Sequence, residues 1–333
     1  MKWMIVVVSD VHLAEMTKYS EDYRNVNLEG LLSEDDRQFL DFLRYIKNHQ
    51  LREGGDLVLL GDVVDFWRRD FAKALRECSV IFSELMNFDS NKVKIHYVVG
   101  NHDYYMLKLR NNLFKGPHFC TVAKSVRLSS GDKSFFFIHG YQLETLANPH
   151  YKSQTAYEEF AEHLCLHGDD IGHAADEVWT LWSRLTIWWK VHRKLASVKK
   201  NTSALSLKRR PKDVNGALRS MMEKPGERLT GRHQAGSMIE MLAGSDARSV
   251  YLGMEGGEVL VFGHTHKPYQ CPPDNDLGAV KVVNTGSWKK SPCGYYSFVV
   301  INEGRVQFHE FKDGGILERN VMDFKRPCKL DPS

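Results

Sequence analysis

Residues 3–13 have the sequence WMIVVVSDVHL, and this stretch sets the pattern that decides the fold. A short apolar, β-branched run ends at Ser9, and Asp10 and His12 follow it. Runs of this kind predict a strand that is buried on both faces. Functional groups in α/β sheets gather where such strands end. Two side chains at a spacing of two point to the same side of an extended chain, so Asp10 and His12 can bind one ion together.

Four further motifs repeat this arrangement. Each lies at the end of a short apolar run and combines glycine with aspartate, asparagine or histidine. They are Gly61-Asp62-Val63-Val64-Asp65, Gly100-Asn101-His102-Asp103, His139-Gly140 and Gly263-His264-Thr265-His266. Any one of them alone is typical of an ordinary turn. All five in this order predict a common site.

The remaining patterns predict an α/β layered domain. Residues 57–60, 93–99 and 134–138 are further apolar runs that favour buried strands. After residue 257, four strand patterns alternate with turn residues. Strands alternating with helices in the first part of the chain are typical of layered α/β folds.

Two helices are predicted between these strands. Ser33 followed by Asp36 is a helix-start pattern, and Phe39 and Phe42 then lie on one helical face. Residues 70–87 have a helical pattern as well.

The motifs contain a set of ligands that suits transition-metal ions. The set comprises four imidazoles, two carboxylates and one amide, from His12, His139, His264, His266, Asp10, Asp62 and Asn101. Mixed nitrogen and oxygen ligands without thiolate favour Mn, Fe, Zn or Ni. A carboxylate has two oxygens and can bridge two cations. We therefore expect two divalent ions, Mn²⁺ above the others, at the spacing of about 3.5–4 Å that is typical of two-metal hydrolases.

Length and composition indicate an ordinary globular protein. The chain has 333 residues, of which 42% are hydrophobic and 26% are charged, which fits one large domain or one domain with an insertion. Six cysteines are scattered without a CxxC pair, as in reduced proteins. The apolar run from Trp3 to Val8 is too short for a signal peptide or a membrane span. We expect a cytoplasmic protein without a transmembrane segment, and the sequence does not predict its oligomeric state.

Residues 141–257 contain none of the five motifs and have mostly helical and loop patterns. They interrupt the predicted core, residues 1–140 and 258–333, and we expect them to form an inserted cap. From Arg184 to His233, fourteen Lys and Arg face three acidic residues, a net charge of +11. The net charge of the whole chain is +3, so the remainder carries −8. A basic block of this kind indicates an anionic partner.

The insert has a tryptophan-rich segment for which three interpretations stay open. Trp182, Trp188 and Trp189 fall at helical spacing among cations. They fit a helix that packs on the core, an interfacial helix in peripheral contact with a membrane, or a nucleic-acid groove. Arg209 and Arg210 belong to a basic loop that suits any anionic substrate.

A second motif in the insert, His163-Leu164-Cys165-Leu166-His167, has the residue types of a metal site. On a helix, however, Cys165 would not share a face with the two histidines. We do not expect a further metal site there.

Taken together, the five motifs resemble the calcineurin-like metallophosphoesterase superfamily over residues 1–140 and 258–312. The resemblance implies an α/β core of two mixed β-sheets flanked by helices, the metallophosphoesterase sandwich, here with an inserted helical cap. It also implies the role of each motif residue. One ion would be held by Asp10, His12 and His266, a second by Asn101, His139 and His264, with Asp62 bridging, His102 as catalytic histidine and Asp65 as its carboxylate partner. The turn Asn284–Ser287 resembles one that many members place behind the site.

Within the superfamily, Ser9–Leu13, Asp65–Trp67 and His264–Pro268 look like the branch of UDP-2,3-diacylglucosamine pyrophosphatases. The chain departs from that branch in two places. It has His102 where those enzymes often have arginine, and Tyr141 where they have aspartate.

These observations predict a two-metal phosphohydrolase in which an activated water attacks a phosphate ester or pyrophosphate, on a lipid- or nucleotide-linked substrate. One alternative is a metal-dependent nuclease acting on DNA or RNA. Another is a non-catalytic scaffold with the same fold, as in a retromer subunit that resembles the superfamily. A protein phosphatase is less favoured, because Phe66 replaces the arginine of those enzymes.

Overall fold

The computed structural model describes residues 3–14, 32–67, 71–113, 119–147, 153–166, 234–245, 247–271, 280–288 and 295–325. The chain divides into two compact units. The core unit comprises Met1–Gly140, Ala161–His173 and Gly257–Ser333, and the insert unit comprises Tyr141–Phe160 and Ala174–Gly256. Ala161–His173 is thus grouped with the core unit. The functional division into core and cap stays a prediction.

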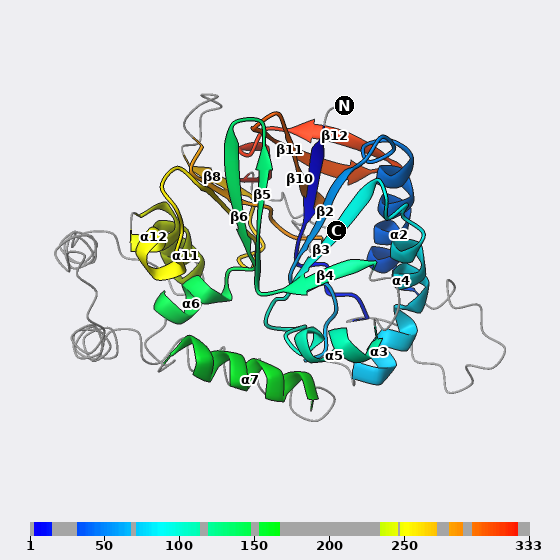
Figure 1. The fold of residues 1–333 in the computed structure, drawn as a ribbon, viewed down its shortest axis with the longest axis horizontal. Helices are drawn as coiled ribbons and strands as arrows, with labels where there is room; N and C mark the ends of the chain where they lie inside the picture. The colour runs from blue at the N-terminus through cyan, green and yellow to red at the C-terminus, as the bar shows by residue number, and fades with distance from the viewer. Residues whose placement is uncertain are drawn as a thin grey trace, which may run out of the picture. The chain divides into compact units, whose positions relative to one another are not determined.

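The first sheet of the core unit has seven strands and is mixed (Figure 1). Its central strand β1 pairs in parallel with β2 and antiparallel with β10. In spatial order the strands are β12 (Gly315–Arg319), β11 (Arg305–Lys312), β10 (Ser297–Asn302), β1 (Met4–Val8), β2 (Gly55–Leu60), β3 (Val93–Val98) and β4 (Cys120–Ala123).

The second sheet has five strands and is also mixed. Its three inner strands are parallel, and the two outer strands are antiparallel to their neighbours. In spatial order they are β5 (Ser125–Ser130), β6 (Lys133–Ile138), β7 (Val259–Phe262), β9 (Val282–Asn284) and β8 (Tyr269–Cys271). Two mixed sheets flanked by helices confirm the fold class that the sequence predicts.

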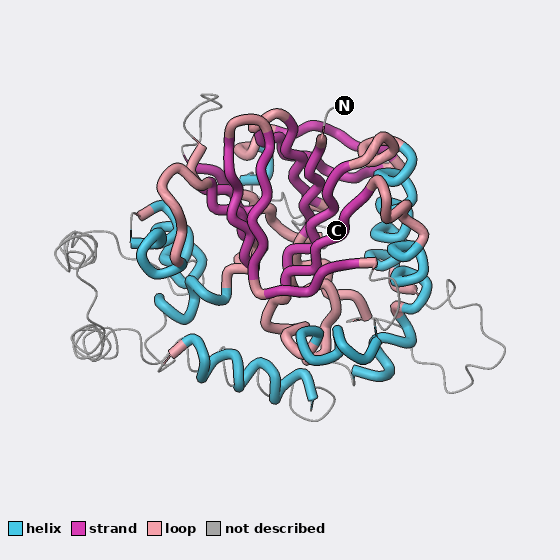
Figure 2. Tube along the Cα trace, in the orientation of Figure 1, coloured by secondary structure: helices cyan, strands magenta, loops and turns pink. Residues whose placement is uncertain are grey.

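The helices of the core unit are α2 (Glu34–Asn48), α3 (Phe71–Glu77), α4 (Ser79–Met86), α5 (Met106–Leu113) and the second half of α7 (Gln154–Leu166), followed near the end by the 3₁₀ helix η1 (Asp323–Lys325). In Figure 2 the strands gather at the centre of this unit, and α2 and α4 run along one flank.

The main hydrophobic core lies between the two sheets. Val58 and Leu60 of the first sheet and Phe135 and Phe137 of the second are fully buried in one cluster with Ile5, Val7, Val261, Val283, Val299 and Ile301. Truncating a buried phenylalanine to alanine typically costs about 3–5 kcal/mol. This apolar layer therefore holds the sheets, and the loops at their ends, in a fixed relation.

Helix α2 covers the outer face of the seven-stranded sheet. It begins where the sequence predicts, because the Ser33 side chain accepts a hydrogen bond from the backbone N–H of Asp36 at 3.1 Å. Phe42 then packs on Phe298 of β10 and on Trp288, with ring centroids 4.9 and 4.6 Å apart. Phe39, also on this face, contacts Trp288 as well.

Most predicted elements are confirmed, with differences at their ends. The helical pattern at 70–87 forms two helices, α3 and α4, that are separated at Cys78. The sequence interpretation missed β4, β5, β8 and β12. These strands have three to six residues, and exposed or half-exposed positions interrupt their apolar patterns.

The insert unit contains α6 (Tyr141–Ala147), the first half of α7, α11 (Gln234–Gly244) and α12 (Ala247–Leu252) among its described residues. Within this unit, the Tyr141 hydroxyl donates to Glu158 at 3.0 Å, and the Tyr141 and Tyr157 rings stack at 5.5 Å. Among the helices that the structure describes, none has the length and apolar character needed to cross a membrane.

Candidate metal centre

The five motifs follow the carboxyl ends of β1, β2, β3, β6 and β7. Pairing of these strands within their sheets brings the motif loops to one edge of the core unit. Three groups of side chains there have ligand atoms within 4.8 Å of one another, as a metal site requires. They are Asp10, His12 and His266; Asp62, His139 and His264; and His12, Asp65 and His102. The first two groups consist of predicted metal ligands alone.

Backbone hydrogen bonds tie the motif loops to one another. The N–H of Asp10 donates to the carbonyl of Gly61 at 3.0 Å, and that of His12 donates to Asp62 at 2.8 Å. On the second sheet, the N–H of Gly263 donates to the carbonyl of His139 at 2.8 Å. The ligand side chains therefore project from loops that constrain one another.

Five of the seven predicted ligands have an unusual backbone conformation. Asp10, His12, Asp62, His264 and His266 have φ angles between 51° and 68°. Non-glycine residues rarely adopt this left-handed region, and each instance costs on the order of 1–3 kcal/mol. Such strain is typical of functional sites, where the surrounding structure imposes it.

The first group forms around Asp10. Its Oδ1 lies 3.2 Å from Nε2 of His266, and Nε2 of His12 lies 3.4 Å from the same His266 atom. The backbone N–H of His264 also donates to the Asp10 carboxylate, at 2.9 Å. These contacts place one carboxylate and two imidazole nitrogens around one point.

The second group forms around His139. Its Nε2 lies 3.1 Å from Oδ2 of Asp62 and 3.2 Å from Nδ1 of His264. On the other side of the ring, Nδ1 lies 3.0 Å from the carbonyl oxygen of Leu60. A histidine that donates one N–H to a backbone carbonyl presents its other nitrogen as a ligand.

Asp62 lies between the two groups. Its Oδ2, close to His139, is also 4.0 Å from Nε2 of His12 in the first group. Its Oδ1 accepts the backbone N–H of His102 at 2.8 Å. One carboxylate oxygen thus faces both groups while the other is held by the backbone.

The environment of the Asn101 side chain indicates that these residues fit a metal. Its side chain is 4% exposed, and its Oδ1 atom is buried without a hydrogen-bond partner among the described residues. An unsatisfied buried amide oxygen costs about 1–3 kcal/mol unless something binds it. A cation would satisfy it, and the mixed oxygen and nitrogen ligands of the motifs suit a divalent transition metal.

His102 and Asp65 form a buried pair. Nδ1 of His102 lies 2.9 Å from Oδ1 of Asp65. The other oxygen of Asp65 lies 3.3 Å from Nδ1 of His12. The indole of Trp67 stacks on the His102 ring with centroids 4.2 Å apart, and its backbone N–H donates to Asp65. The orientation of the His102 ring is therefore fixed from its edge and from its face.

The electrostatics of the site favour ionised carboxylates. Burial alone would raise the pKa of Asp10, but His266 and His139 lower it to about 2. Burial likewise opposes ionisation of Asp62, yet His139 and His102 hold its pKa well below the usual value. Conversely, Asp62 and Asp10 overcome the burial of His139 and raise its pKa to about 10. A bound cation would displace that proton, as metal binding commonly does.

Two motif glycines allow the close approach of these carboxylates. A Cβ atom on Gly100 would lie 2.1 Å from Oδ1 of Asp62. A Cβ on Gly263 would lie 2.4 Å from Oδ2 of Asp10. Both contacts are too short for any side chain, so glycine at these positions follows from the packing of the ligands.

The sequence places Asp103 in a motif but does not predict its role. The buried carboxylate accepts the backbone N–H groups of Val63 and Gly100 at 2.7 and 2.6 Å, and the hydroxyl of Tyr97 at 2.7 Å. It therefore joins the loop of Asp62 to the loop of Asn101. Gly100 and Tyr97 lie near Asp103 in the sequence, but Val63 belongs to a separate segment, so the sequence does not reveal the link between the two loops.

Asn284 supports the last motif from behind. Its Nδ2 donates to the carbonyl of Gly263 at 3.0 Å and to the Thr265 hydroxyl at 2.8 Å. Its own oxygen accepts the N–H of Gly286 at 2.9 Å. The turn at residues 284–287 thus lies where the sequence predicts, against the loop that carries His264 and His266.

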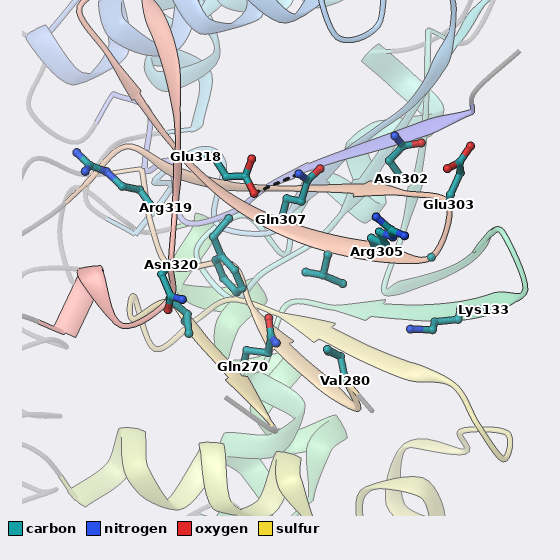
Figure 3. A pocket seen from close by; sticks show the side chains of 14 residues that line it. Lys133, Gln270, Val280, Asn302, Glu303, Arg305, Gln307, Glu318, Arg319 and Asn320 are labelled. Atoms are coloured by element: carbon teal, nitrogen blue, oxygen red, sulfur yellow. Dashed lines mark hydrogen bonds between the residues drawn. The ribbon is translucent and has the colours of Figure 1, made fainter. Parts of the chain in front are cut away.

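The substrate-contacting residues predicted in the insert, Trp182, Trp188, Trp189, Arg209 and Arg210, lie outside the described residues. A separate cavity of about 350 Å³ opens at the opposite edge of the core unit (Figure 3). Its lining includes Lys133 at the start of β6 and Asn302, which pairs with Met4 at the start of β1. None of the predicted metal ligands lines it.

The family comparison agrees with the order of the five motifs. The sequence model of a family described as calcineurin-like phosphoesterase matches residues 4–268. No curated protein matches the chain. Among solved structures, a dimetal phosphatase from Danio rerio has a TM-score of 0.44 and 13% identity, with 96% of each chain covered. Vacuolar protein sorting 29 from Cryptosporidium parvum has a TM-score of 0.35 and 12% identity, also with 96% of each chain covered.

Proposed function

Because the chain belongs to the calcineurin-like phosphoesterase family, we propose that it is a two-metal phosphohydrolase that cleaves a phosphate ester or pyrophosphate bond. The observation that carries this proposal is the position of Asp62. One of its oxygens faces His139 of one ligand group and His12 of the other, at 3.1 and 4.0 Å. A shared carboxylate between two groups of ligands is what a dinuclear site needs.

In this proposal each group holds one ion. Asp10, His12 and His266 hold the first, and Asn101, His139 and His264 hold the second, with Asp62 common to both. Divalent cations bound there would polarise the phosphoryl oxygens and activate a water for in-line attack. The chain supplies the geometry of both ions through loops that are hydrogen-bonded to one another.

His102 is the proposed catalytic residue. Its Nδ1 is held by Asp65, which directs the opposite nitrogen, Nε2, away from that carboxylate. From there it can stabilise developing charge or protonate the leaving oxygen. Asp65 keeps the ring in one orientation, and Trp67 prevents it from tilting.

The substrate class follows from the insert. We propose a lipid- or nucleotide-linked phosphate, bound in part by the aromatic and cationic residues of the insert. A nuclease is the second candidate, and the net charge of +11 between Arg184 and His233 favours it. The buried His102–Asp65 pair, at 2.9 Å, argues against a scaffold without activity, because binding alone does not require it.

The test is a turnover screen of the metal-loaded protein on four probes. These are bis-p-nitrophenyl phosphate, p-nitrophenyl phosphate, a nucleoside-diphosphate lipid and single-stranded DNA. Turnover of the diester with two bound ions per chain is the expected result. Asp62→Asn should lose metal and turnover together, whereas His102→Ala should keep metal and lose turnover. Fewer than two ions in the fully loaded protein, or no turnover of any probe, would overturn the proposal.

A further inference from the structure

The second half of α7 packs against the loop that contains Asn101 and His102. Along α7, the buried side chains are Tyr157, Glu158, Ala161, Leu164 and Cys165, which form one helical stripe. From Ala161 onward the helix is grouped with the core unit. This segment lies within residues 141–257, which contain none of the five motifs.

Cys165 makes the contact with that loop. Its thiol is fully buried and donates to the carbonyl oxygen of His102 at 3.3 Å, and it lies 3.7 Å from the carbonyl of Asn101. Burial raises the pKa of the Cys165 thiol, so the group is a neutral donor. The histidine-flanked cysteine that resembled a metal motif is thus directed toward backbone carbonyls.

The His102 carbonyl receives a second hydrogen bond from another segment. The backbone N–H of Phe66, next to Asp65, donates to it at 3.2 Å. The same carbonyl is therefore held between α7 and the loop that carries Asp65. Next to the loop, Lys108 of α5 pairs with Glu162 of α7, which attaches the helix to the element that follows His102.

We propose that Cys165 is a positioning residue that fixes the Asn101–His102 backbone for metal binding and catalysis. This inference rests on the proposed function. The side chain of Asn101 would bind an ion, and that of His102 would act on the substrate, and both project from the backbone that Cys165 holds. Groups that orient a metal ligand from behind typically contribute 10–100-fold, about 1–3 kcal/mol, to metal affinity or activity.

Two substitutions separate hydrogen bonding from volume. Cys165→Val fills the space but donates nothing, whereas Cys165→Ser keeps a donor. Cys78→Val is the matched control, because Cys78 is equally buried, at 1% exposure, but lies between α3 and α4. Each full-length protein is measured for Mn²⁺ affinity by calorimetry, for kcat and KM on bis-p-nitrophenyl phosphate, and for thermal stability.

Cys165→Val should weaken binding of one of two Mn²⁺ ions and lower kcat, each by roughly tenfold, with little change in KM. Cys165→Ser should stay within about threefold of wild type, since the hydroxyl is still a donor. The Cys78 variant should change thermal stability alone. Wild-type Mn²⁺ affinity and kcat in Cys165→Val would overturn the inference, as would equal losses in the serine or Cys78 variants.

The two proposals fail in distinguishable ways. If the wild-type protein binds Mn²⁺ but hydrolyses no probe, the phosphohydrolase proposal is wrong, and weaker Mn²⁺ binding in Cys165→Val still supports the positioning role. If the wild type hydrolyses the diester and Cys165→Val behaves like it in both measurements, the positioning role is wrong and the proposed function stands.

Discussion

Nδ1 of His102 and Oδ1 of Asp65 lie 2.9 Å apart in a buried pair. The second oxygen of the same carboxylate lies 3.3 Å from Nδ1 of His12, a proposed metal ligand. Asp65 therefore connects the proposed catalytic histidine to the proposed metal centre, a role that its expected partnership with His102 alone did not include.

Asp65→Asn should consequently impair two properties at once. The amide cannot accept from both imidazoles with the strength of a carboxylate, so we expect kcat to fall by roughly 10²-fold or more and Mn²⁺ affinity by roughly tenfold. His102→Ala should lower kcat and leave Mn²⁺ affinity unchanged. Steady-state kinetics with calorimetric Mn²⁺ titration measures both. Unchanged Mn²⁺ affinity in Asp65→Asn would show that the contact with His12 does not contribute to metal binding.

The ligand types predict which metal supports activity. Four imidazoles, two carboxylates and one amide suit Mn²⁺, whereas Mg²⁺ prefers a shell of oxygens. After removal of metal by a chelator, Mn²⁺ should restore turnover of bis-p-nitrophenyl phosphate, and Mg²⁺ should restore it poorly. Equal activity with the two ions would contradict this assignment.

Gly100→Ala should destroy the metal centre. The added Cβ would lie 2.1 Å from Oδ1 of Asp62, so the shared carboxylate or the Asn101 loop must move. We expect loss of at least one of two bound ions, measured by elemental analysis, and loss of turnover. Gly256→Ala is the control, because a Cβ there meets nothing within 4 Å. Two bound ions in Gly100→Ala would mean that the site tolerates a displacement that its packing excludes.

The stability of the fold should depend on pH through Asp36. Burial raises the pKa of this carboxyl from 3.8 to about 6. Between these two pKa values the folded protein binds more protons than the unfolded chain. The free energy of unfolding therefore falls as pH rises from about 4 to about 6, by on the order of 3 kcal/mol in total. Above the pKa of the folded state, Asp36 is ionised in both states, and the free energy of unfolding has lost this whole contribution.

Asp36→Asn removes this titration. Relative to wild type, its thermal stability should therefore be higher at about pH 7.5 than at about pH 4. Melting curves in the presence of a chelator keep the metal centre out of the comparison. Asp41→Asn, which changes an exposed carboxylate of the same helix, is the matched control. A constant difference between Asp36→Asn and wild type at both pH values would refute the prediction.

The insert should govern the choice of substrate. Joint substitution of Trp182, Trp188 and Trp189 by alanine should impair hydrolysis of a nucleoside-diphosphate lipid while turnover of bis-p-nitrophenyl phosphate continues. Remote binding contributes to kcat as well as KM, so both should change for the lipid.

Substitution of Arg209 and Arg210 by glutamine should instead weaken the binding of single-stranded DNA. In the wild type this binding should also depend steeply on salt. If either set abolishes turnover of the small diester in a folded, metal-loaded protein, the insert contributes to the chemistry itself.

The sequence predicts most of the proposed metal centre because four of the five motifs follow a continuous apolar run, in β1, β2, β6 and β7. Val58, Leu60 and Phe137 are buried by the sheets, and their regular pattern locates the strand ends and hence the ligands. The roles of Asp103 and Cys165 could not be predicted in this way. The contact of Asp103 with Val63 and that of Cys165 with His102 join segments that only the folded chain brings near. No periodic pattern marks such contacts. Short strands with exposed positions, such as β12, were missed for a related reason.

The strained left-handed backbone of the ligands lowers the stability of the fold, although the site needs these residues. The strained ligands are Asp10, His12, Asp62, His264 and His266. Glycine at any of these positions would relax the local conformation, yet it would delete a ligand. Laboratory selection for heat resistance alone, under conditions where cations are scarce, should therefore accumulate changes in these loops and erode the centre. Selection that also demands metal should leave them intact and find its gains elsewhere, which is the usual trade-off between stability and activity.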